Sequence, residues 1–213
     1  YDAAANLQLG KFFPTDWGIN IPFYAQYSKD NSYQQFDPYE RDLTVDEKVE
    51  ALNKSVDNGV RTQSAVDSLV LDVEERSKET STIKTFNFTN VKKDGKGGKP
   101  WSISNFSASY AYTETVKTDA IIKEDKTQEN ATTLNYNYSN KAKAIQPFKK
   151  IKSKSLKLIK EFNFNLLPKS FTFSTNINRL INSRTFRLPS TPVFRFDDRR
   201  FLWDRNYGLN WDF

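Results

Sequence analysis

Hydrophobic and polar residues alternate with a period of two along several long stretches of this chain. Between residues 105 and 113, Phe106, Ala108, Tyr110 and Tyr112 alternate with small polar residues. Side chains on a β-strand point to opposite faces in turn, so this pattern predicts strands with one apolar and one polar face. The alternation recurs at 133–139 and 171–178. The polar positions there carry Ser, Thr and Asn, and the charged residues are expected to collect in the connections.

The alternation and the turn signals between its segments predict about nine strands. Pro22 has no backbone N–H, so the strand that contains it is expected to be irregular or to face a sheet edge at that point. Phe86 and Phe88 are out of phase with Val91, so their segment fits the alternation imperfectly. The expected strands cover residues 3–11, 19–27, 83–91, 103–116, 131–139, 161–167, 170–180, 184–196 and 201–213.

Residues 29–82 interrupt the alternation with helical spacing. Thr44 and Glu47 form a capping-box sequence ahead of an apolar stripe, and Asn58-Gly59 predicts the end of that helix. A second helix is expected to open at Ser64. The segment therefore predicts an α-helical hairpin inserted between strands.

One apolar face and one neutral polar face are typical of the wall of a transmembrane β-barrel, with lipid outside and an aqueous lumen inside. We therefore predict an all-β fold whose antiparallel strands form part of a large barrel in the bacterial outer membrane. Residues 1–28 and 83–213 are expected to be barrel strands, and residues 29–82 an inserted loop. An 11-residue strand rises about 36 Å, or about 26 Å along the membrane normal at a tilt near 45°. Because the alternation continues to Phe213, the sheet is expected to continue beyond this chain.

The alternation assigns strand residues to the two faces. The residues expected to face the membrane are Phe106, Tyr110, Tyr112, Leu134, Tyr136, Tyr138, Phe171 and Phe173. The residues expected to face the lumen are Asn105, Ser107, Ser109, Thr113, Asn135 and Asn137. The expected neighbours of these faces are the lipid bilayer and the rest of the same barrel.

Composition narrows the functions that remain. Aromatic residues make up 15% of the chain although hydrophobic residues reach only 37%, a bias that barrels share because rings collect at the lipid–water boundaries. The chain has no Cys and no His, so the common catalytic triads are unavailable. The adjacent carboxylates Glu74-Glu75 and Asp197-Asp198 are interpreted as a solvated helix surface and a charged strand connection. We expect no catalysis, no cofactor and no metal site.

Charge offers one further candidate surface. A lysine-rich run extends from Lys141 to Lys160 without an acid between them. It is interpreted as a solvated loop, with contact to anionic lipid headgroups as another interpretation. Few aromatic or arginine residues are interleaved with it, so we expect no nucleic-acid partner. The glycine-rich turn at 93–99 lacks the Ser or Thr that a phosphate loop carries after its lysine.

Short motifs along the chain resemble a segment of the family of SprA, an outer-membrane protein of gliding motility and type IX secretion. The resemblance implies a very large barrel, a translocon that exports folded proteins to the cell surface. It also implies partners, namely secreted protein cargo and outer-membrane shuttle and plug proteins. A chain of 213 residues would form only a wall segment of such a barrel. The motifs are Leu9-Gly10-Lys11, Pro14, Trp17-Gly18, Ile21-Pro22-Phe23, Tyr27-Ser28, Phe88-Thr89-Asn90-Val91, Ser104-Asn105-Phe106-Ser107, Leu134-Asn135-Tyr136-Asn137-Tyr138, Gln146-Pro147-Phe148-Lys149, Phe162-Asn163-Phe164-Asn165 and Leu167-Pro168.

Two alternatives from other classes stay open. A soluble β-sandwich could bind surface glycans, in which case Trp17, Trp101, Trp203 and Trp211 should share one platform. A small passive porin-like barrel would need an even number of strands and Phe213 as its true end. The loop lengths do not alternate between short and long, so the side of the membrane on which the helical insertion lies also stays open.

Overall fold

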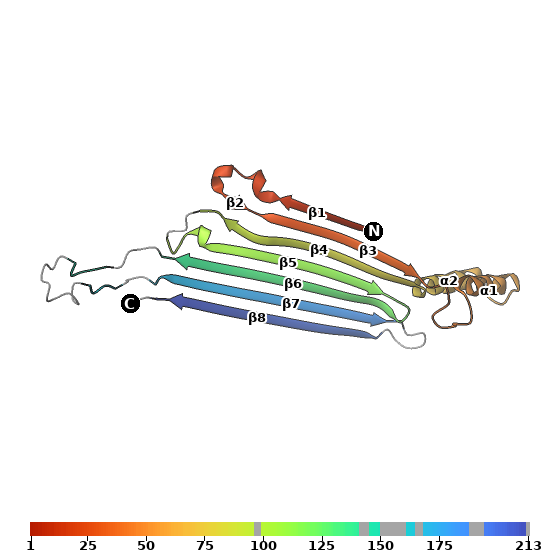
Figure 1. The fold of residues 1–213 in the computed structure, drawn as a ribbon. Coiled ribbons are helices and arrows are strands. Elements are labelled where there is room, and N and C mark those ends of the chain that lie inside the picture. Colours follow the sequence, from red (N-terminus) through yellow and green to blue (C-terminus); the bar gives the residue numbers. More distant parts are fainter. Residues whose placement is uncertain (96–98, 141–144, 150–160, 165–167, 188–193, 212–213) are drawn as a thin grey trace.

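The computed structural model describes residues 1–95, 99–140, 145–149, 161–164, 168–187 and 194–211. The described residues form strands and two α-helices, and three short 3₁₀ helices lie at strand ends (Figure 1). The strands are β1 (Asp2–Gln8), β2 (Ile19–Asn20), β3 (Pro22–Tyr33), β4 (Lys78–Lys93), β5 (Phe106–Thr118), β6 (Ile122–Ser139), β7 (Ser170–Phe186) and β8 (Arg195–Asn210). The helices are α1 (Val45–Asp57) and α2 (Gln63–Arg76).

The strands form one antiparallel sheet in which successive strands lie side by side. The order across it is β1-β3-β4-β5-β6-β7-β8, and the two-residue β2 pairs with β4. Figure 1 shows the helical hairpin at one end of this sheet, beyond the ends of the strands. The all-β fold with an inserted helical hairpin is thus confirmed. The sheet is open, with β1 and β8 as its two edges.

Several expected boundaries are wrong. β3 continues to Tyr33 and β4 begins at Lys78, so the insertion occupies residues 34–77 instead of 29–82. The expected strand at 184–196 is divided, because its start belongs to β7 and its end to β8. The expected strand at 161–167 is reduced to one bridge between Ile145 and Phe164, and residues 165–167 lie outside the described part. Most of the lysine-rich run also lies outside the described residues.

The expectation that charges collect in the connections is wrong as well. Residues 122–129 belong to β6, and Asp197-Asp198 lie in β8 and not in a connection. Cross-strand ion pairs accompany this pairing: the Arg184 Nη2 lies 2.6 Å from the Asp125 Oδ2 on the neighbouring strand. Opposite charges on paired strands stabilise the sheet. The long strands therefore have a charged half next to the helices and an aromatic half beyond it. In β6 the charged half is residues 122–129 and the aromatic half is residues 130–139.

A β-bulge explains the imperfect alternation in β4. The pairing of β4 with β5 shifts between Phe88 and Val91, and Asn90 within the shift has a positive φ of 51°. An extra residue in one strand moves the following side chains to the other face. As a result Phe88 pairs with Tyr110 and Val91 pairs with Ala108, both on the same face of the sheet.

The helical hairpin follows its sequence signals closely at α1. Thr44 accepts a hydrogen bond from the Glu47 N–H and Glu47 reaches back to the Thr44 N–H, which completes the expected capping box. The second helix begins at Gln63, one residue before the expected start. Neither described helix is long and apolar enough to cross a membrane.

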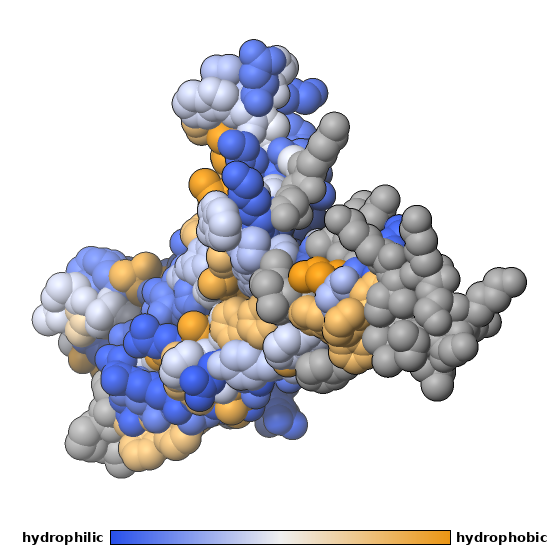
Figure 2. Space-filling view, turned by 90° about the vertical axis from the view of Figure 1, so that its left-hand side faces the viewer, coloured by the Kyte–Doolittle hydropathy of each residue, from blue (hydrophilic) through white to orange (hydrophobic). Residues whose placement is uncertain are grey.

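The sheet has almost no hydrophobic core. Among the described residues, only Val66, Val73 and Tyr138 are buried hydrophobic residues, and the two valines belong to α2. Figure 2 looks toward the end of the sheet opposite the helices, where hydrophobic residues reach the surface beside hydrophilic ones. A single layer is not a sandwich, and the described part of the chain contains no second sheet packed on the first.

Candidate functional site: the two faces of the sheet

Aromatic rings on one face of the sheet contact one another from strand to strand. We call this surface the aromatic face. Its ring pairs cross from β3 to β8, and aromatic pairs of this geometry contribute about 0.5–1.5 kcal/mol each beyond their burial. The ring centroids are 4.9 Å apart for Phe23 and Phe88, 4.8 Å for Phe86 and Tyr112, 4.8 Å for Phe106 and Tyr136, 5.7 Å for Tyr136 and Phe171, and 5.1 Å for Phe173 and Tyr207.

All eight residues expected to face the membrane lie on this aromatic face, because the strand register places them opposite one another. Phe106 pairs with Tyr136, and Tyr138 pairs with Phe171. Seven of the eight side chains are half-buried or exposed, among them Phe106 at 41%, whereas Tyr138 is only 5% exposed. Whether this face meets lipid stays a prediction.

The opposite surface, the polar face, carries hydroxyl and amide side chains. Of the six residues expected to face the lumen, Ser107, Ser109, Thr113, Asn135 and Asn137 lie on it. Hydrogen bonds join its side chains across neighbouring strands. The Thr133 Oγ1 donates to the Asn176 Oδ1 at 2.9 Å, and the Ser174 Oγ donates to the Asn135 Oδ1 at 2.8 Å. In its aromatic half this face carries mainly hydroxyl and amide side chains, and its charged residues there include Lys92 of β4 and Asp204 of β8.

Asn105 does not lie in a strand, so its expected lumen-facing position is wrong. It ends the 3₁₀ helix Ile103–Asn105 that precedes β5, and only 6% of its surface is exposed. Its Nδ2 donates to the backbone carbonyl oxygens of Lys99 and Pro100 at 2.8 and 3.2 Å. Asn105 therefore holds the loop before β5 in place.

A charged network marks the point where the aromatic face of β4–β6 gives way to the charged half. The Glu114 carboxylate lies 3.3 Å from the Lys84 Nζ and 3.0 Å from the Lys126 Nζ. It also accepts hydrogen bonds from Tyr112 and Gln128 at 3.1 and 2.9 Å. Its side chain is only 12% exposed, so the surrounding donors replace water. Sequence alone did not indicate this network, because its members lie on three strands.

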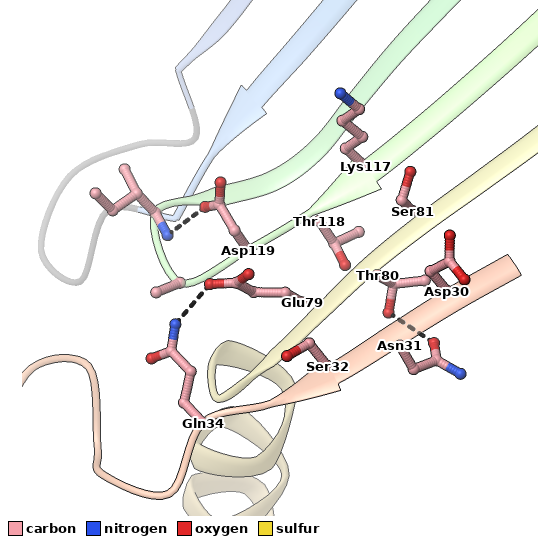
Figure 3. A pocket seen from close by; sticks show the side chains of 12 residues that line it. Asp30, Asn31, Ser32, Gln34, Glu79, Thr80, Ser81, Lys117, Thr118 and Asp119 are labelled. Carbon is pink, nitrogen blue, oxygen red and sulfur yellow. Dashed lines mark hydrogen bonds between the residues drawn. The ribbon is translucent and has the colours of Figure 1, made fainter.

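A hollow of about 640 Å³ lies at the helix-side ends of β3, β4 and β5 (Figure 3). Its lining is mostly polar, and two of its carboxylates already have partners in the fold. Glu79 accepts a hydrogen bond from Gln34 at 2.6 Å, and Asp119 accepts from the backbone N–H groups of Ile121 and Ile122 at 2.8 and 2.6 Å. These carboxylates stabilise strand ends and turns. No group of three or more metal-binding side chains is found in the residues described.

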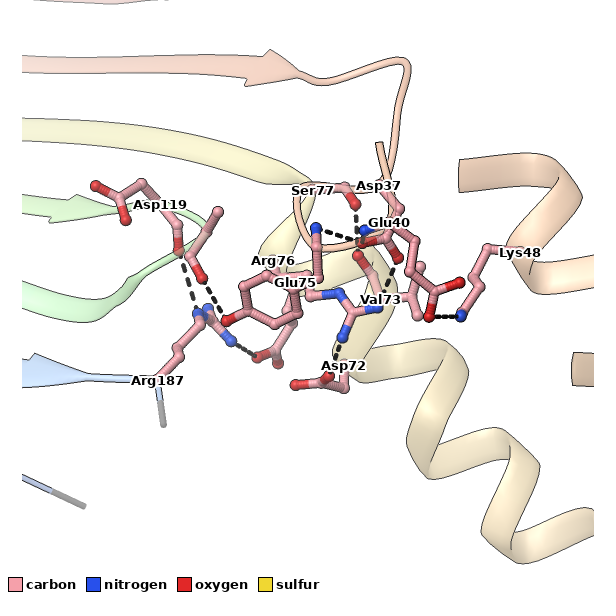
Figure 4. A network of polar contacts seen from close by, with 12 residues as sticks. Asp37, Glu40, Lys48, Asp72, Val73, Glu75, Arg76, Ser77, Asp119 and Arg187 are labelled. Atoms are coloured by element: carbon pink, nitrogen blue, oxygen red, sulfur yellow. Dashed lines mark hydrogen bonds and ion pairs between the residues drawn. The ribbon is translucent and has the colours of Figure 1, made fainter. Parts of the chain in front are cut away.

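A buried ion pair anchors the helical hairpin beside this hollow (Figure 4). Asp37 is fully buried, and its Oδ2 lies 2.6 Å from the Nη2 of Arg76 at the end of α2. Burial alone would raise the pKa of Asp37, but hydrogen bonds from Arg76 and from the Tyr39 and Glu40 N–H groups outweigh it, so the pKa is lowered. The Arg76 guanidinium also stacks 4.6 Å above the centre of the Tyr39 ring.

Further contacts join the hairpin to the turns at the strand ends. The Tyr39 hydroxyl donates to the backbone oxygen of Ala120 at 2.9 Å. Arg187, which follows β7, contacts the Glu75 carboxylate and the Asp119 backbone oxygen at 3.2 Å each. The hairpin is thus fixed to the sheet from both the β5–β6 turn and the end of β7.

The N-terminal part of the chain matches a family of known proteins. The model of the SprA_N family, described as motility related/secretion protein, matches residues 1–49. The chain resembles a segment of SprA. The matched region covers β1, β2, β3 and the start of α1. No curated protein matches the chain. The SprA-like motifs from Phe88 onward lie outside the matched region.

Two glycines of the SprA-like motifs have structural roles in this region. A Cβ on Gly10 would lie 2.3 Å from the backbone oxygen of Ile19, so only glycine allows that close approach. Gly18 has a φ of 58°, a left-handed conformation that other residues rarely adopt. Both glycines therefore shape the connection between β1 and β3.

Proposed function

We propose that this sheet is a wall segment of a very large outer-membrane β-barrel that conducts proteins to the cell surface, in type IX secretion and gliding motility. The aromatic face meets lipid and the polar face lines the aqueous passage. The observation that carries this proposal is the partly exposed ladder of aromatic rings on one face of a single-layer sheet. Soluble proteins rarely leave a large apolar patch exposed unless it binds something. The resemblance to SprA, a motility- and secretion-related protein, supports the same assignment.

The length of the aromatic half supports a membrane crossing. In β6 it has ten residues, from 130 to 139, which rise about 33 Å along the strand. At a tilt near 45° they cover about 24 Å, close to the apolar band of about 25 Å in outer-membrane barrels. The charged half then extends beyond the hydrocarbon into water, where its charged groups stay hydrated and are not transferred into lipid.

The polar face suits a passage for many different proteins. A fixed charge attracts oppositely charged passengers and slows their release. A lining of Ser, Thr and Asn hydrates well without such attraction. The proposed role is passive conduction without catalysis, and the cargo, shuttle and plug proteins are the partners that the resemblance implies.

The open edges fit a wall segment. β1 and β8 each present one row of backbone groups that no described strand pairs, and an unpaired edge cannot face hydrocarbon. In the proposed barrel, further strands of the same wall pair with both edges.

Charge added to the polar face tests the conducting role. Ser107 and Ala111 lie on that face in β5, and we propose the double variant Ser107→Arg with Ala111→Arg. Export of acidic cargo should fall, while export of basic cargo and barrel assembly should persist. The matched control is Ser107→Gln with Ala111→Gln, which adds length without charge. Equal export of acidic and basic cargo by the arginine variant would contradict the proposal.

The alternative functions make different predictions. A glycan-binding sandwich requires a second layer and a shared tryptophan platform, whereas Trp17, Trp101 and Trp203 lie on separate elements of the described chain. Fractionation of the full-length protein separates the classes most simply: the wall segment requires the membrane fraction, and the sandwich requires the soluble one.

A further inference from the structure

Two arginines lie on the aromatic face of β7 and β8, where the aromatic half meets the charged half. We call Arg179 and Arg199 the arginine patch, and they are level with Asn130 and Gln128 of β6. Arg179 is directly opposite Phe201, which places Arg199 and Trp203 at its two diagonal positions. Diagonal neighbours across antiparallel strands are about 7–8 Å apart. Both arginines are exposed.

Aromatic side chains are interleaved with this patch. The Arg205 guanidinium lies 4.3 Å from the centre of the Trp203 ring, so it stacks on the indole. The Trp203 Nε1 donates to the Thr175 Oγ1 at 2.7 Å, which fixes the orientation of the ring. Trp203 and Phe201 keep 54% and 61% of their surface exposed. The patch thus combines cations with fixed, exposed rings.

No guanidinium of the patch forms an ion pair with any described residue. Other arginines of the sheet do: Arg184 pairs with Asp125, and Arg195 pairs with Asp197 at 3.1 Å. Asp198, next to Arg199, lies on the polar face. Asp197 lies two residues from Arg199 on the aromatic face, where it pairs with Arg195 and also attracts Arg199. Arg179 has no carboxylate directly opposite it, because its partners in β6 and β8 are Asn130 and Phe201.

The same boundary in β4–β6 is built differently. There Lys84 and Lys126 also lie on the aromatic face, but Glu114 pairs with both. In β7–β8 the positions level with Glu114 are Ile181 and Arg199, so no carboxylate takes that place. The boundary in β7–β8 therefore presents its two arginines without a carboxylate directly opposite them on a described strand.

We propose that the arginine patch binds the phosphate groups of anionic lipid headgroups, while Phe201 and Trp203 enter the headgroup boundary. This inference rests on the proposed membrane-facing role of the aromatic face. Arginine donates paired hydrogen bonds to phosphate, and tryptophan favours the lipid–water interface. The cost of an arginine on a lipid-facing wall is largest at the bilayer midplane and falls toward the interface, where phosphate is available.

Lipid binding by the full-length protein in detergent tests the inference. Phosphatidylglycerol, phosphatidylcholine and inorganic phosphate are titrated separately, and bound lipid is counted by native mass spectrometry. The double variant Arg179→Gln with Arg199→Gln should bind phosphatidylglycerol about 25-fold more weakly, because each cation near an anionic surface contributes about a fivefold factor. Phosphatidylcholine binding should change little.

Two adjacent arginines supply a matched control. Arg199 lies on the aromatic face and Arg200 on the polar face of the same strand. Arg199→Gln should weaken phosphatidylglycerol binding about fivefold, whereas Arg200→Gln should leave it unchanged. Equal losses in the two variants would overturn the inference. So would inorganic phosphate or an acidic peptide occupying the patch as tightly as the lipid does.

The result can be separated from the fate of the proposed function. If the full-length protein fractionates with membranes but shows no preference for phosphatidylglycerol, only the lipid site fails. If the protein is found in the soluble fraction, the membrane-facing role fails and the lipid site loses its basis.

Discussion

The helical hairpin and the sheet differ in how far their hydrophobic side chains are exposed. In the hairpin, Val66 and Val73 of α2 are 0% and 2% exposed. On the sheet, Phe86 and Phe106 keep 40% and 41% of their surface exposed. Burial of an apolar side chain contributes about 1.5–3 kcal/mol, so the hairpin gains this energy within the chain. If the aromatic face meets lipid, as proposed, the rings of the sheet gain this energy from the bilayer.

The two regions also hold charge differently. The hairpin buries Asp37 against Arg76, where each charge depends on the other. The charged half of the sheet keeps its ion pairs near water, as with Lys84, which is 49% exposed. Exposed ion pairs contribute little, whereas breaking a buried one is costly. A single substitution should therefore destabilise the hairpin most when it removes a buried charge partner. In the sheet, its effect should depend on whether the substituted residue lies on the aromatic face or the polar face.

The largest effect is expected at the buried ion pair of the hairpin. Arg76→Met keeps an apolar stem but leaves the Asp37 carboxylate buried without its cation, which should destabilise the hairpin by about 3–5 kcal/mol. Hydrogen exchange of the full-length protein should show faster exchange in α1 and α2 and unchanged exchange in the strands. Arg61→Met, at an exposed position between the helices, is the control. Unchanged protection of α2 would contradict the anchoring role.

The next largest effect is expected when an arginine is placed on one or the other face of β5. Ala108 lies on the aromatic face and Ala111 on the polar face. Ala108→Arg should lower the stability of the membrane-inserted protein by about 2–4 kcal/mol if the position is near the bilayer midplane. Ala111→Arg should be tolerated, because its side chain enters water. Folding yield into lipid vesicles measures both variants, and equal yields would remove the distinction between the faces.

Acid should loosen the hairpin more than the sheet. The pKa of Asp37 is lowered by folding, so its contribution to stability is complete above the ordinary carboxyl pKa of about 4. That contribution is lost as the pH falls through the lowered pKa of the folded state. Hydrogen exchange of α2 between neutral and strongly acidic pH should show this loss. The variant Asp37→Asn should lose most of the dependence, and a variant that kept it would identify another group as its source.

The smallest effect concerns the starts of the two helices. Thr44 caps α1 through its side chain, whereas Thr62 makes no side-chain cap at the start of α2. Thr44→Ala should cost about 1 kcal/mol of helix stability, and Thr62→Ala should cost less. Thermal unfolding of the hairpin compares the two variants, and an equal loss would show that the capping box contributes nothing beyond a threonine.

Sequence periodicity predicted the aromatic half of the sheet because the alternation is visible within the sequence of each strand. It also predicted α1, since Thr44 and Glu47 are local partners. It missed the charged halves: residues 122–129 pair with their neighbours across strands, and a pattern within one strand does not show this. The Asp37–Arg76 pair joins residues 39 positions apart. The arginine patch depends on the register of β7 and β8, which the sequence does not state.

The central claim is that the aromatic face meets hydrocarbon and the polar face meets water. Because this chain has no cysteine, single cysteines can be introduced at residues 131–138 of β6 in the full-length protein and spin-labelled. Accessibility to oxygen, which enters lipid, and to a water-soluble nickel complex is then measured in vesicles. We expect the two accessibilities to alternate in opposite phase, with oxygen favoured at positions 134, 136 and 138. Equal access of the nickel complex to both faces would contradict the account.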